Sequence, residues 1–156
     1  MNIRFTLNGQ DVLIDVEPER RVLNILREDF GYFHARGTCY TGECGACTIF
    51  FNGEIAPSCL IPAFTLRESK VITFEWFSET EDCQDIIKGL ADAGYESCKY
   101  CTPARILVIH ALLENNPRPD EDEILRALSG MRCYCSDYTS LIEGVKNAGL
   151  IRNRRR

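Results

Sequence analysis

Two patterns of apolar and polar positions follow each other along the chain, and the first predicts a small sheet. Apolar and polar residues alternate over 3–16 on either side of an Asn-Gly pair, as in two strands joined by a tight turn. The segment 48–59 repeats this arrangement around a second Asn-Gly pair, and a last strand is predicted over 70–76. Apolar residues at helical spacing over 20–30 predict one helix, whereas the glycine- and cysteine-rich segment 33–47 has no period and predicts a loop.

The second half of the chain predicts four helices. Three of them begin at capping signals: the Ser-Glu-Thr-Glu run at 78–81, the Thr-Pro pair at 102–103, and Asp120 followed three residues later by Glu123. A fourth helix is predicted over 138–148. Because no strand pattern interrupts these segments, the second half is expected to be all α.

The change of pattern near residue 77 divides the chain into two units. We expect an α+β unit over 1–77 and a helical unit over 78–150, with Trp76 and Phe77 packed between them. His110 lies among apolar residues of a predicted helix and is expected in the core or at an interface. The last six residues, 151–156, include four arginines and are expected to form a disordered basic tail.

Composition excludes several functional classes. With 45% apolar and 26% charged residues, the chain has the composition of an ordinary globular protein. A net charge of −5 argues against a nucleic-acid partner, since phosphate contacts need a basic surface. No apolar run approaches the roughly 18 residues of a membrane span. The first residues also lack the apolar core of a signal peptide, so a cytoplasmic location is expected.

Cysteine is the unusual residue, with nine copies among 156 residues. In a reducing compartment, disulfides are a poor explanation for this count, and eight of the nine fall into two tight groups. The ninth, Cys83, shares an apolar helical face and is expected to be a buried thiol. The grouping therefore indicates metal binding.

The first cysteine set has the spacing C-x4-C-x2-C-x11-C. Its members are Cys39, Cys44, Cys47 and Cys59. The first two intervals are those of plant-type ferredoxins, in which a loop wraps a [2Fe–2S] cluster. Zinc ligands more often form two short cysteine pairs, and a Rieske centre would need two histidine ligands. The spacing therefore favours an iron–sulfur cluster.

The second cysteine set combines C-x2-C and C-x-C, separated by 31 residues. Its members are Cys98, Cys101, Cys133 and Cys135. Each pair lies at the start of a predicted helix, where free N–H groups favour thiolates. Two such helix ends facing each other could hold an iron–sulfur cluster, but a zinc ion with four cysteine ligands fits the pattern as well.

The two sets together resemble a known family. The segments 37–48 and 98–103, with Cys59 and the Cys-x-Cys pair at 133–135, resemble both signatures of the iron–sulfur small subunit of molybdenum hydroxylases. This family includes xanthine dehydrogenase, aldehyde oxidoreductase and aerobic carbon monoxide dehydrogenase. The resemblance covers residues 3–150. It implies the fold class α+β, with a ferredoxin-like β-grasp domain followed by an all-α four-helix domain.

The resemblance also implies two [2Fe–2S] clusters that act as a relay. The second cysteine set would hold the cluster proximal to a molybdopterin cofactor on a large partner subunit. The first set would hold the distal cluster, nearer an FAD-binding subunit. On this interpretation the chain is the electron-transfer subunit of a hetero-oligomeric oxidoreductase of the xanthine dehydrogenase type, and it performs no substrate chemistry itself.

The second signature departs from the usual family text at several positions, among them Ser97, Lys99, Tyr134 and Asp137. In relatives, a glutamine at the first of these positions lies beside the pterin, and serine is shorter. The cysteines are intact and their surroundings are altered, and serine reaches less far toward a pterin than glutamine does.

Three alternatives follow from the residues. The chain could be an independent two-cluster ferredoxin, although the helical unit is superfluous for that task. It could be a one-cluster ferredoxin or binding module with structural zinc at the second cysteine set. The altered second signature could also mark a complex whose large subunit has a different cofactor or substrate.

Overall fold

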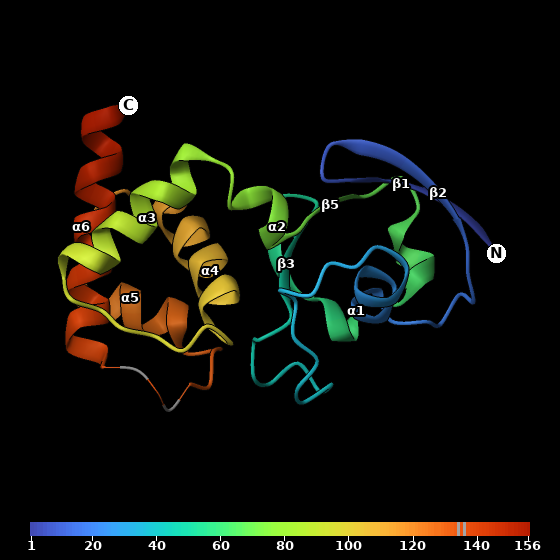
Figure 1. Cartoon of the computed structure of the whole chain (residues 1–156), viewed down its shortest axis with the longest axis horizontal. Coiled ribbons are helices and arrows are strands. Elements are labelled where there is room, and N and C mark those ends of the chain that lie inside the picture. The colour runs from blue at the N-terminus through green and yellow to red at the C-terminus, as the bar shows by residue number, and fades with distance from the viewer. Residues whose placement is uncertain (134, 136) are drawn as a thin grey trace.

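The chain folds as a mixed sheet with short helices in its first half and a group of longer helices in its second half (Figure 1). The computed structural model describes residues 1–133, 135 and 137–156. The two halves lie side by side, and β3 and α2 are the elements nearest the helical half (Figure 1). This arrangement confirms the predicted α+β class.

The sheet has five strands in the order β2-β1-β5-β3-β4. They are β1 (Asn2–Leu7), β2 (Gln10–Asp15), β3 (Thr48–Phe51), β4 (Glu54–Pro57) and β5 (Lys70–Ile72). Both hairpins turn at the predicted Asn-Gly pairs, where Asn8 and Asn52 have φ angles of 52° and 51°. The glycines that follow also have positive φ, as tight primed turns require. β1 pairs with β5 in parallel, so β1 lies inside the sheet and β5 is its central strand.

One short helix packs on this sheet, as predicted. It begins as α1 (Val22–Asn24) and continues as the π-helical turn η1 (Ile25–Asp29). Its apolar residues share a buried cluster with Ile3, Phe5 and Leu7, the alternate residues of β1 that face inward. The loop 33–47 is irregular as expected, and it is held to the helix because Ala35 joins the same buried cluster and Arg27 donates to its carbonyl at 2.8 Å.

The last strand is shorter than predicted. β5 ends at Ile72, and the short helix α2 (Phe74–Phe77) takes the place of the remaining strand residues. Asn8 stops the strand because its side chain bonds Thr73 twice, accepting from the backbone N–H at 2.8 Å and donating to Oγ1 at 3.1 Å. Phe77 is buried as expected, whereas Trp76 is 46% exposed.

Four helices lie in the described part of the helical half. They are α3 (Glu81–Asp92), α4 (Thr102–Asn115), α5 (Glu121–Leu128) and α6 (Tyr138–Arg155). The predicted capping box of α5 is confirmed, since Asp120 and Glu123 bond each other's backbone N–H at 2.8 Å. The cap of α3 was misplaced by the sequence pattern, because Thr80 accepts from the Cys83 N–H at 3.2 Å and Ser78 does not cap this helix.

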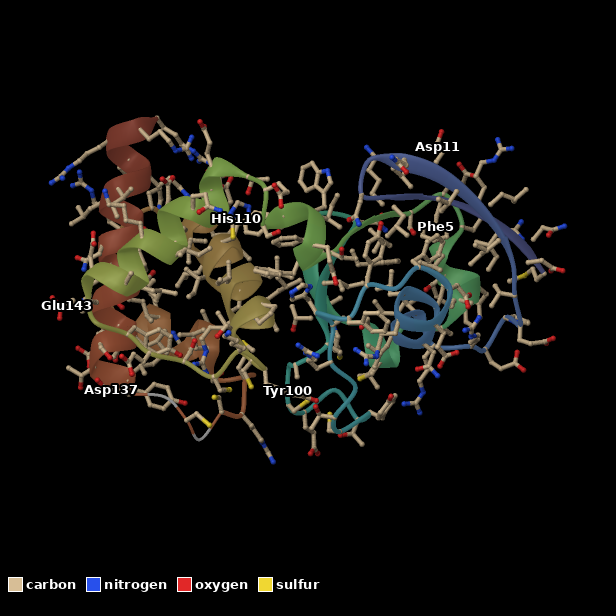
Figure 2. The ribbon with its side chains drawn as sticks, in the orientation of Figure 1. Phe5, Asp11, Tyr100, His110, Asp137 and Glu143 are labelled. Carbon is tan, nitrogen blue, oxygen red and sulfur yellow. The ribbon has the colours of Figure 1, made fainter. Side chains whose placement is uncertain are left out.

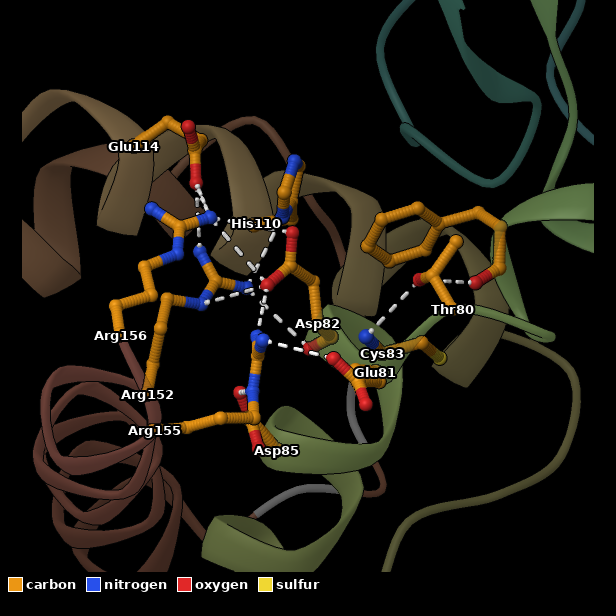
Figure 3. A network of polar contacts seen from close by, with 11 residues as sticks. Thr80, Glu81, Asp82, Cys83, Asp85, His110, Glu114, Arg152, Arg155 and Arg156 are labelled. Carbon is orange, nitrogen blue, oxygen red and sulfur yellow. Dashed lines mark hydrogen bonds and ion pairs between the residues drawn. The ribbon is translucent and has the colours of Figure 1, made fainter.

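The expectation of a disordered basic tail over 151–156 was wrong. α6 continues to Arg155, and its arginines face acidic residues of α3 and Glu114 of α4 (Figure 3). Arg152 is only 1% exposed and lies 3.1 Å from the Glu114 carboxylate. Arg155 lies 2.8 Å from Asp85. These ion pairs explain why a run of arginines forms part of a helix.

The two halves meet at a cluster of three aromatic rings. Phe50 of β3, Phe77 of α2 and His110 of α4 have ring centroids 4.6–5.9 Å apart. Phe50 belongs to the buried cluster of the helical half although it lies on a strand. The position expected for His110 is thereby confirmed. The limits 1–77 and 78–150 remain a proposal. No helix in the described part of the chain combines the length and apolar character that a membrane crossing requires.

Candidate metal centres

The first cysteine set lies on the loop 33–47 and on the turn after β4. The loop turns through residues with positive φ, among them Gly42 and Gly45 at 79° and 74°. A Cβ on Gly42 would lie 2.4 Å from a methyl group of Leu60, and one on Gly45 would lie 2.8 Å from the carbonyl oxygen of Gly130. Glycine is therefore needed at both positions for conformation and for close approach.

Cys39 and Cys44 form one pair in this set. The Cys39 sulfur accepts the backbone N–H groups of Thr41 at 3.4 Å and of Cys44 at 3.5 Å. Hydrogen bonds from the Thr41 side chain and from these two N–H groups lower the pKa of Cys39 to about 5. Such N–H donors stabilise the thiolate form that a metal ligand must adopt.

Cys47 and Cys59 form a second pair, and both are buried. The 3-10 turn Ser58–Leu60 carries Cys59 back to the loop, and the Ser58 hydroxyl fixes it by donating to the Cys47 carbonyl at 2.7 Å. Burial raises the pKa of Cys47 to about 11, and the adjacent Cys59 adds to this effect. A thiol of this kind ionises when a metal cation supplies positive charge.

The pairing of thiols fits a two-iron cluster. Each iron of a [2Fe–2S] cluster takes two cysteine thiolates, so four ligands are needed as two pairs. A single zinc ion would instead hold all four sulfurs at about 3.8 Å from one another, given its tetrahedral bonds of about 2.3 Å. Among the described residues, no three sulfurs of the first set lie within 4.8 Å of one another.

The second cysteine set converges at the start of α4. The sulfurs of Cys98, Cys101 and Cys133 lie within 4.8 Å of one another. Cys135 lies outside this group of three but beside Cys98, whose hydrogen bond and charge raise the pKa of Cys135. Burial, with the charges of Cys133 and Cys98, raises the pKa of Cys101 to about 12. The spacing of these thiols fits either a [2Fe–2S] cluster or one zinc ion.

Two of the departures from the family signature, at Ser97 and Asp137, have structural roles. The Ser97 hydroxyl is bonded to Thr102 Oγ1, and Thr102 in turn donates to the Cys98 carbonyl at 2.7 Å. Asp137 caps α6 by accepting the backbone N–H groups of Thr139 and Ser140 at 3.0 and 3.3 Å. The position of Tyr134 lies outside the described residues.

The two cysteine sets are connected directly. The Arg132 N–H, next to Cys133, donates to the Cys44 carbonyl at 3.2 Å. Gly45 packs against Gly130 and Met131 at the same point. No sequence signal marks this contact, because it joins segments that are far apart along the chain.

Neither Cys83 nor the cluster of Asp82, His110 and Glu114 has the surroundings of a metal centre. Cys83 is buried, and burial raises its pKa to about 11, as expected for a core thiol. Asp82, His110 and Glu114 offer ligand atoms within 4.8 Å of one another. The guanidinium of Arg152 already forms ion pairs with both carboxylates and a hydrogen bond with His110, so a side-chain cation occupies this position (Figure 3).

Comparisons with known proteins match both halves of the chain. A profile of the 2Fe-2S iron-sulfur cluster binding domain matches residues 5–73, and one of the [2Fe-2S] binding domain matches residues 73–146. The nicotinate dehydrogenase small FeS subunit of Eubacterium barkeri is 40% identical over 148 residues, which are 95% of this chain and 94% of that protein. The chain belongs to the iron–sulfur small subunits of the xanthine dehydrogenase family.

Further relatives of similar length support the assignment. The alpha subunit of isoquinoline 1-oxidoreductase from Brevundimonas diminuta is 32% identical over 137 residues, which are 87% of this chain and 90% of that protein. The crystal structure of quinoline 2-oxidoreductase from Pseudomonas putida 86 contains a chain with a TM-score of 0.86 and 30% identity. The match covers all of this chain and 96% of the other. This small subunit is therefore an iron–sulfur, electron-transferring component of an oxidoreductase.

Proposed function

We propose that this small subunit holds two [2Fe–2S] clusters and passes single electrons between two partner subunits. The first cysteine set would hold the distal cluster and the second set the proximal one. When bound, such a cluster takes up and releases one electron at a time. The role of the chain is then to hold the two clusters at a fixed separation and to set their potentials.

The observation that carries this proposal is the direct contact between the two cysteine-bearing loops. The hydrogen bond from Arg132 to the Cys44 carbonyl, 3.2 Å long, joins a residue next to Cys133 to a member of the first set. Two redox centres on these loops would therefore be close neighbours. The match of both halves to [2Fe–2S] binding domains favours a second cluster over structural zinc.

The surroundings of the thiols supply the means to set potentials. N–H groups that donate to a ligand sulfur favour the reduced, more negative cluster and raise its potential. Cys39 receives two such bonds. Cys47 and Cys59 are buried, and exclusion of water opposes added negative charge.

The expected partners are a molybdopterin-binding large subunit and an FAD-binding subunit. Large apolar side chains are exposed beside the cysteines of both sets, among them Tyr40, Leu60 and Tyr100. Exposed apolar groups at the sites favour a permanent subunit over a free two-cluster ferredoxin. The relatives are named for nicotinate, isoquinoline and quinoline, so an aromatic nitrogen heterocycle is the substrate class we propose for the complex.

Metal analysis and co-purification test this proposal. We expect the anaerobically purified chain to contain four irons and four acid-labile sulfides, two from each [2Fe–2S] cluster. A tag on this chain should also retain a large subunit that contains molybdenum and a subunit that contains FAD. Two irons with one zinc per chain would contradict the second cluster. A chain with four irons that purifies alone would instead support the independent ferredoxin.

A further inference from the structure

Tyr100 reaches from the second cysteine set to the first. It lies within the Cys-x-x-Cys pair of the second set, next to Cys101. Its hydroxyl is 2.5 Å from Oγ1 of Thr38, the residue before Cys39. Tyr100 lies where the helical half faces the loops below the sheet (Figure 2). One side-chain hydrogen bond thus joins the neighbours of a cysteine from each set.

The first loop holds the tyrosine ring as well as its hydroxyl. The Arg36 guanidinium lies over the Tyr100 ring, 5.3 Å from its centroid. Arg36 is itself fixed to the loop, because its backbone N–H donates to the Ala46 carbonyl at 3.0 Å. The loop is also folded tightly beside Thr38, since a Cβ on Gly37 would meet the Tyr40 ring. Thr38 is therefore held in place to receive the Tyr100 hydroxyl.

This bond complements the backbone contact between the loops. The Arg132 N–H bonds the Cys44 carbonyl on the side of the Cys-x-Cys pair, and Tyr100 bonds Thr38 on the side of the Cys-x-x-Cys pair. Each half of the second set is thereby tied to the first loop. The hydroxyl of Tyr100 can be removed without changing the backbone, so its effect can be measured separately.

We propose that Tyr100 is a positioning residue that fixes the two cysteine sets relative to each other through its bond to Thr38. By doing so it sets the rate of electron exchange between them, a role that rests on the proposed two-cluster function. In this exchange one electron leaves one set's cluster and enters the other. One centre is oxidised by one electron as the other is reduced, and no proton or covalent bond is transferred.

Two conservative variants and their combination test this inference in the full chain with its clusters loaded. Tyr100→Phe keeps the ring under Arg36 and removes only the hydroxyl, and Thr38→Val removes the other partner at similar volume. We expect each variant to keep its iron and both EPR signals. Electron exchange after pulsed one-electron reduction should slow by roughly fivefold. Loss of one neutral hydrogen bond is expected to reduce, by about this factor, the population of molecules that hold the two sets in the arrangement seen here. The magnetic interaction between the two reduced centres should weaken in parallel.

The double variant identifies the bond as the cause. Because both single changes remove the same interaction, the double variant should be no slower than either single one. Tyr32→Phe is the matched control, since its ring stacks on Phe30 and its hydroxyl bonds none of the described residues. This control should exchange electrons at the unmodified rate.

The contrary outcomes separate this inference from the proposed function. An unmodified chain without two cluster signals would overturn both. An unmodified chain with two signals, combined with unchanged exchange in both single variants, would overturn only the role of Tyr100. Additive slowing in the double variant would also overturn it, because the two side chains would then act separately and not through their shared bond. Loss of iron from both single variants would overturn it as well, because the bond would then serve cluster assembly.

Discussion

The Phe77 ring lies against the His110 imidazole, with ring centroids 4.6 Å apart. This contact joins the end of α2 to the middle of α4, and Phe50 of β3 completes the cluster. Because α2 connects the sheet to the helices, the aromatic cluster fixes how the halves pack. It therefore also fixes how the two cysteine-bearing loops face each other.

Removing the Phe77 ring should destabilise the protein strongly. Phe77→Ala empties a buried site at the junction and should lower the free energy of unfolding by about 3–5 kcal/mol, as measured by denaturant titration. Trp76→Ala is the matched control on the same helix, because Trp76 is 46% exposed. The control should cost about 1 kcal/mol or less. Equal losses in the two variants would contradict the role of Phe77 in the junction.

His110 should make stability depend on pH near neutrality. Burial lowers the pKa of His110, and the positive charge of Arg152 lowers it further. The unfolded chain therefore binds a proton at His110 more readily than the folded chain does. The stability that this difference contributes is fully present at high pH. It should fall as pH decreases through the unfolded value of about 6.5, until the folded His110 titrates as well.

A variant without the imidazole isolates this effect. Between about pH 7.5 and about pH 6, the free energy of unfolding of His110→Gln should fall less than that of the unmodified chain. Phe50 and Phe77 would still pack at the junction. Parallel pH profiles for the two proteins would show that His110 does not titrate differently on unfolding.

Gly45 should be needed for the contact between the loops as well as for its own conformation. Gly45→Ala forces a side chain into the left-handed region and toward the carbonyl of Gly130, 2.8 Å away. We expect Gly45→Ala to lower the iron content and to weaken the contact between the loops that carry the two cysteine sets. Gly53→Ala has the same conformational strain, with φ of +87°, but its Cβ would meet open space. It should lose about 1 kcal/mol of stability and keep its full iron content.

The two cysteine sets should be separable by mutation. Cys44→Ser removes a proposed ligand of the first set and should abolish the EPR signal of the distal cluster while the other signal persists. Cys83→Ser is the control, because this thiol is buried outside both sets. It should reduce stability and leave both signals. Simultaneous loss of both signals from Cys44→Ser would argue against two separate sites.

Local features were predictable from the sequence, and contacts between distant segments were not. The Asn-Gly hairpins and the cap at Asp120 depend on a few consecutive residues, and the structure contains them as predicted. The spacing of each cysteine set is also a local pattern. The arginines of α6 were misjudged because their partners on α3 lie some 70 residues away in sequence.

The packing between the two halves and the link between the two cysteine sets could be found only from the folded structure, for the same reason. The sequence pattern assigned Trp76 to a strand, but β5 ends earlier because Asn8 bonds Thr73. Asn8 lies 65 residues upstream, so this contact has no local signal in the sequence. Tyr100 had no signal beyond its place between two cysteines, and its partner Thr38 lies 62 residues away. Sequence patterns therefore indicated the proposed ligands, whereas the fold was needed to find what holds the two sets together.

The central claim is that one chain holds two distinct [2Fe–2S] clusters on adjoining loops. An EPR-monitored redox titration of the anaerobically purified full chain tests it most directly. We predict two [2Fe–2S] signals that appear at separate potentials, each accounting for one electron per chain, with magnetic interaction between them when both are reduced. A single signal with zinc bound at the second cysteine set would contradict the claim.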